Sequence, residues 1–133
     1  MPFVSATRLR LRSGRYLIPF IIYSSLSSRQ ARRSRGNLGL KLLRDANQTF
    51  WTLTVWQDEE AIRSFMLAGS HRRAMHKLLD WCDEASVAHW KQETSKLPGW
   101  DQAHRKIVEQ GRPSKVRFPS SDHIARRIPE PQG

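Results

Sequence analysis

The sequence predicts an α+β domain in which one antiparallel sheet packs against helices. Its 133 residues, 38% of them hydrophobic, suit a single domain with a core of its own. Stretches with strand and helix periodicity follow one another in the order strand, helix, strand, strand, helix, strand. The single cysteine, Cys82, excludes a disulfide framework and a cysteine-based structural zinc site. Packing must therefore hold this fold together.

The first three elements follow local signals. Residues 3–11 alternate between two faces, as expected for a strand. Pro19 suits the first turn of a helix over about residues 17–35, and Gly36 suits the end of that helix. A short second strand is expected over residues 39–44.

Residues 49–57 carry the strongest strand signal in the chain. Large apolar side chains occur on both of its faces, so both faces are expected to be covered. Asp58 then suits the N-cap of a helix, because the acidic residues that follow it complement the positive end of a helix dipole.

The second half of the domain continues this alternation. The helix after Asp58 is expected to be interrupted at Gly69, where Ser70 can cap a second piece over residues 71–82. A fourth strand is expected over residues 85–92, and a further helix over residues 100–110.

This order of elements is that of a split βαβ, ferredoxin-like sandwich. The domain is expected to span residues 3–111. Residues 112–133 contain four prolines and are expected to form an extended C-terminal arm, ordered only where it docks. Helices would cover one face of the sheet, so the other face is expected to need a partner.

The formal net charge of +11 is concentrated near the N-terminus, since residues 1–47 hold ten Lys or Arg and one acid. Such a charge suits nucleic acid, an acidic membrane surface, an anionic ligand or only a solvated surface. The apolar run over residues 16–23 is far shorter than the roughly 20 residues that a membrane span needs. We therefore expect a cytoplasmic protein with no membrane partner.

Part of the sequence resembles a known family. The segments that carry the resemblance are FWTLTVWQDEEAIRSFMLAGSHRRAM, WCDEASVAHW and LPGW. They resemble the small dimeric α+β-barrel proteins of the antibiotic-biosynthesis-monooxygenase superfamily, and the chain is most similar to a bacterial branch with no assigned activity. The resemblance covers about residues 3–118. It implies a homodimer whose two sheets pack face to face, with a pocket between the sheet and helices of each subunit.

The resemblance also implies a class of function. Members of the superfamily include cofactor-independent oxygenases of aromatic compounds, which implies a monooxygenase-like protein that acts on or binds an aromatic small molecule. Haem-degrading members use an Asn on the first strand, a Trp on the second helix and an iron-ligating His about ten residues later. Here the first strand has no Asn, Phe65 stands where the Trp would be, and His76 could match the His. No cofactor is therefore expected, and haem is kept as an alternative ligand.

Six residues are candidates for the pocket. His71 or His76 could accept the proton of a phenolic substrate, and His71 is expected at a helix start, where the dipole favours the neutral imidazole. No pair of histidines has a recognised zinc spacing, so no metal site is expected. The aromatic side chains that could line the pocket, or could equally fill a core or an interface, are Trp51, Trp56, Phe65 and Trp90.

Two other classes of function stay open. The same pocket could hold an apolar ligand, haem included, without turnover. Alternatively, the basic N-terminal third could bind nucleic acid. This last interpretation is the least favoured, because the aromatic residues of the strands alternate to both faces instead of forming one aromatic and basic sheet surface.

Overall fold

The computed structural model describes residues 1–67 and 69–132, with the backbone alone over residues 69–74. Within this part of the chain, five antiparallel strands form one sheet in the order β2-β3-β1-β4-β5. The strands are β1 (Phe3–Leu11), β2 (Asn37–Asp45), β3 (Thr49–Trp56), β4 (Cys82–Lys91) and β5 (Arg112–Pro113). The helices are α1 (Leu17–Arg33), preceded by the 3-10 turn η1 (Gly14–Tyr16), α2 (Glu59–Met66), α3 (Gly69–Trp81), α4 (Trp100–Gln110) and α5 (Ser121–Ala125).

The predicted fold class, an α+β ferredoxin-like sandwich, is confirmed by this order and by the sheet topology. Several element boundaries differ from the predictions by one to three residues. The largest difference is at β4, which begins at Cys82 and not at residue 85, so that the helix before it ends at Trp81. Cys82 is fully buried and pairs with Leu11 at the end of β1, across a register shift in the ladder. Pairing with the neighbouring strand therefore overrides the helical periodicity at this residue.

Local signals fix two of the element boundaries. The carboxylate of Asp58 accepts a hydrogen bond from the backbone N–H of Ala61 at 2.9 Å, as the N-cap of α2. Gly36 follows α1 with φ of +88°, a conformation that side chains disfavour. A Cβ on Gly36 would also lie 2.6 Å from that of Ala61, so the turn needs glycine for close approach too.

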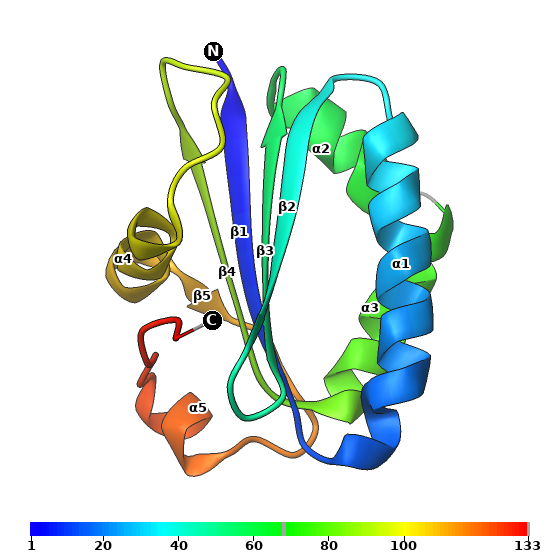
Figure 1. The fold of residues 1–133 in the computed structure, drawn as a ribbon, viewed down its shortest axis with the longest axis vertical. Coiled ribbons are helices and arrows are strands. Elements are labelled where there is room, and N and C mark those ends of the chain that lie inside the picture. Colours follow the sequence, from blue (N-terminus) through cyan, green and yellow to red (C-terminus); the bar gives the residue numbers. More distant parts are fainter. Residues whose placement is uncertain (68, 133) are drawn as a thin grey trace.

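The sheet separates two layers. Helices α1, α2 and α3 lie on one side of it, and α4 and α5 lie on the other (Figure 1). No helix in the described part of the chain is long and apolar enough to cross a membrane.

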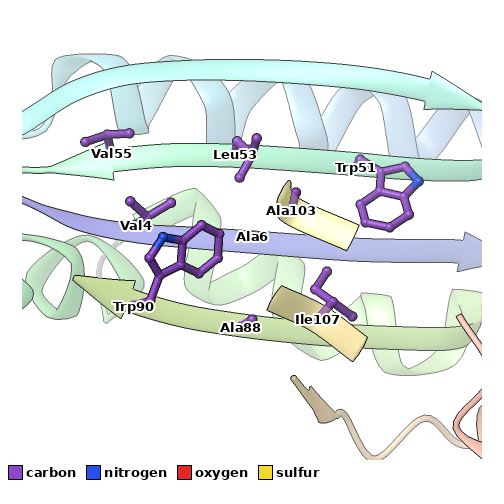
Figure 2. Close-up of a cluster of buried hydrophobic side chains, with 9 residues drawn as sticks. All are labelled: Val4, Ala6, Trp51, Leu53, Val55, Ala88, Trp90, Ala103 and Ile107. Atoms are coloured by element: carbon purple, nitrogen blue, oxygen red, sulfur yellow. The ribbon is translucent and has the colours of Figure 1, made fainter. Parts of the chain in front are cut away.

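The face that was expected to need a partner is covered by the chain itself. Side chains from β1, β3 and β4 meet Ala103 and Ile107 of α4 in one cluster (Figure 2). Leu53, Val55 and Ala103 are fully buried there. A homodimer stays a prediction, but the sheet face on which the resemblance implied it is already occupied by α4.

The C-terminal arm is folded onto the domain and is not extended throughout. The backbone N–H of Ser114 donates to the carbonyl of Ala85 at 2.8 Å, and that of Ser120 donates to the carbonyl of Asp83 at 3.0 Å. Val116 is buried in the core beside α1 and β4. The arm thus contributes to the core, while the division at residues 111 and 112 stays a prediction.

A buried ion-pair network absorbs part of the N-terminal charge. Arg8 and Glu84 are both buried, and their side chains lie 2.7 Å apart. Arg10 also donates to Glu84, at 2.9 Å, and so does the hydroxyl of Ser120, at 2.8 Å. Burial pushes the pKa of Glu84 upward, but these hydrogen bonds outweigh it and hold the pKa below its ordinary value.

Candidate functional site

A cavity of about 200 Å³ lies between the sheet and the layer formed by α1, α2 and α3. Its walls are mostly aliphatic and aromatic, with hydroxyl groups distributed among them. Mostly apolar walls with a few polar groups are typical of sites for small organic ligands. This cavity is the candidate site.

The strand register builds the floor of the cavity. Ser5 on β1 lies directly opposite Thr54 on β3 and His89 on β4, so three polar side chains form a row across the sheet. All three line the cavity, and the name polar row is used below for Thr54, Ser5 and His89. The next row along the strands places Thr7 opposite Thr52, which adds two further hydroxyls.

This polar row is unusual for the inner face of a sheet. Ser5 and Thr54 are buried, although polar side chains are mostly exposed in folded proteins. Burying hydroxyls costs free energy unless they make hydrogen bonds, so a row of them facing a cavity suits a ligand with polar groups.

His89 is the titratable group of the polar row. Its ring packs edge-on against Phe3, with the ring centroids 5.5 Å apart. Burial lowers the pKa of His89, and the positive charge of Arg112 lowers it further, while Glu59 opposes both. The imidazole is therefore neutral at neutral pH and can accept a proton from a bound ligand.

Helix α1 supplies one wall. Its inward side consists of two aromatic rings near the N-terminus, a group of serines and a small residue near the C-terminus: Phe20, Tyr23, Ser24, Ser27, Ser28 and Ala31. The opposite wall comes from the apolar sides of α2 and α3, namely Ile62, Phe65, Met66, Met75, Leu78 and Leu79. Met75 and Leu79 are also exposed to solvent, so the cavity opens beside α3.

Two predicted aromatic residues belong to this site. Phe65 lines the cavity. Trp56 is fully buried and stacks on Phe65, with ring centroids 5.1 Å apart, so it supports the wall from behind. This arrangement follows from the alternation of β3, which puts Trp56 on the same face as Thr54.

The other two predicted aromatic residues lie elsewhere. Trp51 and Trp90 are buried on the opposite face of the sheet, in the cluster under α4 (Figure 2). The indole N–H of Trp51 donates to Asp45 at 3.0 Å, and Lys106 lies over the ring of Trp90. Their placement suits core packing and does not support ligand binding in this cavity.

Of the two predicted histidines, the structure describes the side chain of His76 alone. His76 is exposed on α3 and does not line the cavity. His71 lies in the α3 segment whose side chains fall outside the described residues. No cluster of metal-ligating side chains is found among the residues that the structure describes.

Sequence reasoning missed the polar row. Its signal was present, because Ser5 and Thr7 alternate on one strand and Thr52 and Thr54 on another. The large area of the tryptophan side chains instead predicted an aromatic lining for the pocket. That His89 shares a face with Ser5 follows from the pairing of β1 with β4, which only the structure supplies.

The chain shares its ferredoxin-like α+β fold with solved structures that include a cofactor-independent oxygenase and proteins described as candidate antibiotic biosynthesis monooxygenases. It belongs to the family described as Domain of unknown function (DUF3291), whose model matches residues 27–123. No curated protein matches the chain.

Solved structures share the fold at low sequence identity. A conserved protein from Methanosarcina mazei Go1 is 9% identical with a TM-score of 0.63, covering 70% of this chain and 94% of its own. SnoaB, a cofactor-independent oxygenase from Streptomyces nogalater, is 15% identical in a mutant form, with a TM-score of 0.60, covering 74% of this chain and 98% of its own. A protein from Nitrosomonas europaea, described as a candidate antibiotic biosynthesis monooxygenase, is 13% identical with a TM-score of 0.62. The match covers 68% of this chain and 89% of that protein. These likenesses establish the fold.

Proposed function

We propose that the cavity binds a small aromatic compound with an acidic hydroxyl and that the protein oxidises it with O₂ without a cofactor. The polar row carries this proposal, because it places one neutral imidazole beside two hydroxyls in a cavity whose walls are mostly apolar. An apolar wall holds the ring, and the polar row orients its oxygen atoms. The likeness to SnoaB, a cofactor-independent oxygenase, gives independent support.

His89 starts the reaction as a general base. A phenolic O–H of the substrate donates to its imidazole, which takes up the proton and leaves an electron-rich phenolate. The phenolate reduces O₂ and a bond forms between a ring carbon and oxygen. The O–O bond then breaks, so that one oxygen atom stays on the ring as a quinone carbonyl and the other leaves as water. A dihydroxynaphthalene and O₂ would thus yield a hydroxynaphthoquinone and water.

The size of the cavity limits the ligand. About 200 Å³ exceeds the roughly 150 Å³ of an engineered cavity that binds benzene, and it is smaller than most drug-sized sites. One or two fused rings therefore fit better than haem. His76, the position that could match an iron-ligating histidine, does not line the cavity, and no step is assigned to haem.

The test is O₂ consumption with a dihydroxynaphthalene as the probe, together with quinone formation followed by absorbance. We expect His89→Ala to lower the rate by about 10²-fold or more, the usual loss for a general base. The exposed His76→Ala is the matched control and should retain the full rate. A loss in His71→Ala with a normal rate in His89→Ala would move the base to α3 and contradict this assignment.

A second candidate is a binding protein that performs no turnover, which the same apolar cavity favours. Tight binding of the probe without O₂ consumption would decide for it. Nucleic-acid binding is disfavoured, because Arg8 is committed to a buried ion pair and the two tryptophans of β3 are buried, one on each face of the sheet.

A further inference from the structure

The outward side of α1 is unlike the rest of the protein surface. Its exposed residues occur at helical spacing and divide into an aliphatic half followed by a basic half. They are Ile18, Ile21, Ile22, Ser25, Leu26, Arg29, Arg32 and Arg33, and the name α1 face is used below for this set. Ile18 is 71% exposed and Ile22 is 54% exposed, so these large side chains are not covered by the chain itself.

The charged side chains of α1 and of the segment that precedes it all have one sign. Residues 1–44 contain no acid at all. Arg12 and Arg15 are exposed beside the N-terminal end of α1, and Arg29, Arg32 and Arg33 are exposed at its C-terminal end. Among the described residues, no carboxylate forms an ion pair with the three arginines at the C-terminal end.

This charge decides between two occupants of an exposed aliphatic surface. In a two-fold contact between copies, antiparallel α1 helices would bring Arg29 and Arg32 against Arg12 and Arg15 of the other copy. Parallel helices would bring like ends together. Both arrangements place cations against cations, and residues 1–44 supply no acid to separate them, which is unfavourable. A surface of anionic lipid headgroups, by contrast, accepts the arginines, and its acyl region accepts the aliphatic side chains.

We propose that the α1 face docks on the surface of an anionic membrane. A helix that lies on a bilayer needs aliphatic side chains to insert and cations to meet headgroups, and its length does not matter. The expectation of no membrane partner rested on the shortness of the apolar run over residues 16–23, which bears on spanning and not on surface attachment. The α1 face has both components of surface binding.

Docking there would also place the cavity close to the bilayer. The inward side of α1 lines the cavity, and α3, whose exposed Met75 and Leu79 stand at the opening, packs against α1 in the same layer (Figure 1). An apolar substrate partitions into a bilayer, so a membrane-docked cavity would receive it from there. The attachment itself does not depend on the proposed oxidation.

The test is sedimentation of the full chain with vesicles, without any substrate. The vesicles are phosphatidylcholine alone or phosphatidylcholine with one quarter phosphatidylglycerol. Each basic residue near an anionic surface strengthens binding about fivefold, so several of them should give at least about a tenfold preference for the anionic vesicles. Ile18→Ser/Ile22→Ser should weaken that binding by about tenfold or more, because two aliphatic anchors are lost.

The matched control is Val108→Ser/Ile124→Ser, which changes two equally exposed aliphatic side chains on α4 and α5. It should bind like the unmodified chain. Equal binding to both kinds of vesicle, no binding to either, or an unchanged affinity in Ile18→Ser/Ile22→Ser would overturn the proposal. So would analytical ultracentrifugation in which the chain is a dimer that Ile18→Ser/Ile22→Ser converts to a monomer, since a second copy would then cover the α1 face.

Discussion

At the scale of single residues, the polar row carries the chemistry assigned to the cavity. Ser5 and Thr54 could be placed on the inner face of a sheet from the alternation of their strands alone. His89 could not, because its face relative to Ser5 depends on the β1–β4 register. For Trp51 the size of the side chain predicted a place in a ligand pocket. Its position on the strand instead directs the side chain to the other face of the sheet, under α4.

The lowered pKa of His89 predicts how stability depends on pH. The unfolded chain takes up this proton near the ordinary histidine value, while the folded chain resists it, so acid favours unfolding. The stabilising contribution of neutral His89 is present above about pH 6.5 and is lost as the pH falls below that value. Between pH 7.5 and pH 5.5, the free energy of unfolding measured with urea should therefore fall less for His89→Gln than for the unmodified chain. An equal loss in both proteins would refute the neutral state of the half-buried His89.

The buried pair of Arg8 and Glu84 predicts a large effect on stability. Removing one partner leaves a buried charge uncompensated, so Glu84→Ala should lower the free energy of unfolding by about 3–5 kcal/mol. The exposed Glu93→Ala should change it by less than about 0.5 kcal/mol. Urea unfolding at pH 7 measures both, and a loss below about 1 kcal/mol for Glu84→Ala would mean that Arg8 finds another partner.

At the scale of elements, most of the secondary structure could be predicted because its signals are local. The N-cap of Asp58 and the stop at Gly36 act within a few residues, and both are seen in the structure. The position of α4 could not be predicted in this way. Its apolar side, with Ala103 and Ile107, suits either face of a sheet, and the sequence does not record which face is free.

Gly36 allows a direct test of the first helix boundary. Gly36→Ala should lower the free energy of unfolding by about 1–3 kcal/mol, because φ is positive and the new Cβ meets Ala61 at 2.6 Å. Gly39→Ala is the matched control, since there the nearest atoms belong to the side chain of Leu97 at 3.4 Å and φ is not positive. Thermal unfolding followed by circular dichroism compares the two variants. A Gly39→Ala protein as unstable as Gly36→Ala would contradict this account of the turn.

At the scale of the whole molecule, one sheet serves two purposes. The face on the α4 side holds the fold together through an apolar cluster and the buried pair of Arg8 and Glu84, whereas the face under α1, α2 and α3 encloses a cavity with hydroxyls and an imidazole. Helix α4 of the same chain covers the first face, whereas the sequence predicted that this face needs a partner. The proposed binding of an aromatic compound uses the second face and its helices.

The central claim is that this cavity binds a small aromatic compound, and calorimetric titration with a dihydroxynaphthalene in the absence of O₂ tests it most directly. Ser27 points into the cavity from α1, and Ser25 lies on the exposed side of the same helix, so phenylalanine at either position makes a matched pair. We predict that the unmodified chain and Ser25→Phe bind the probe with the same Kd. In Ser27→Phe the new ring fills part of the 200 Å³ cavity. This variant should bind the probe at least about tenfold more weakly, because less space is left for the ligand. An equal Kd in all three proteins, or no binding by the unmodified chain, would contradict the claim.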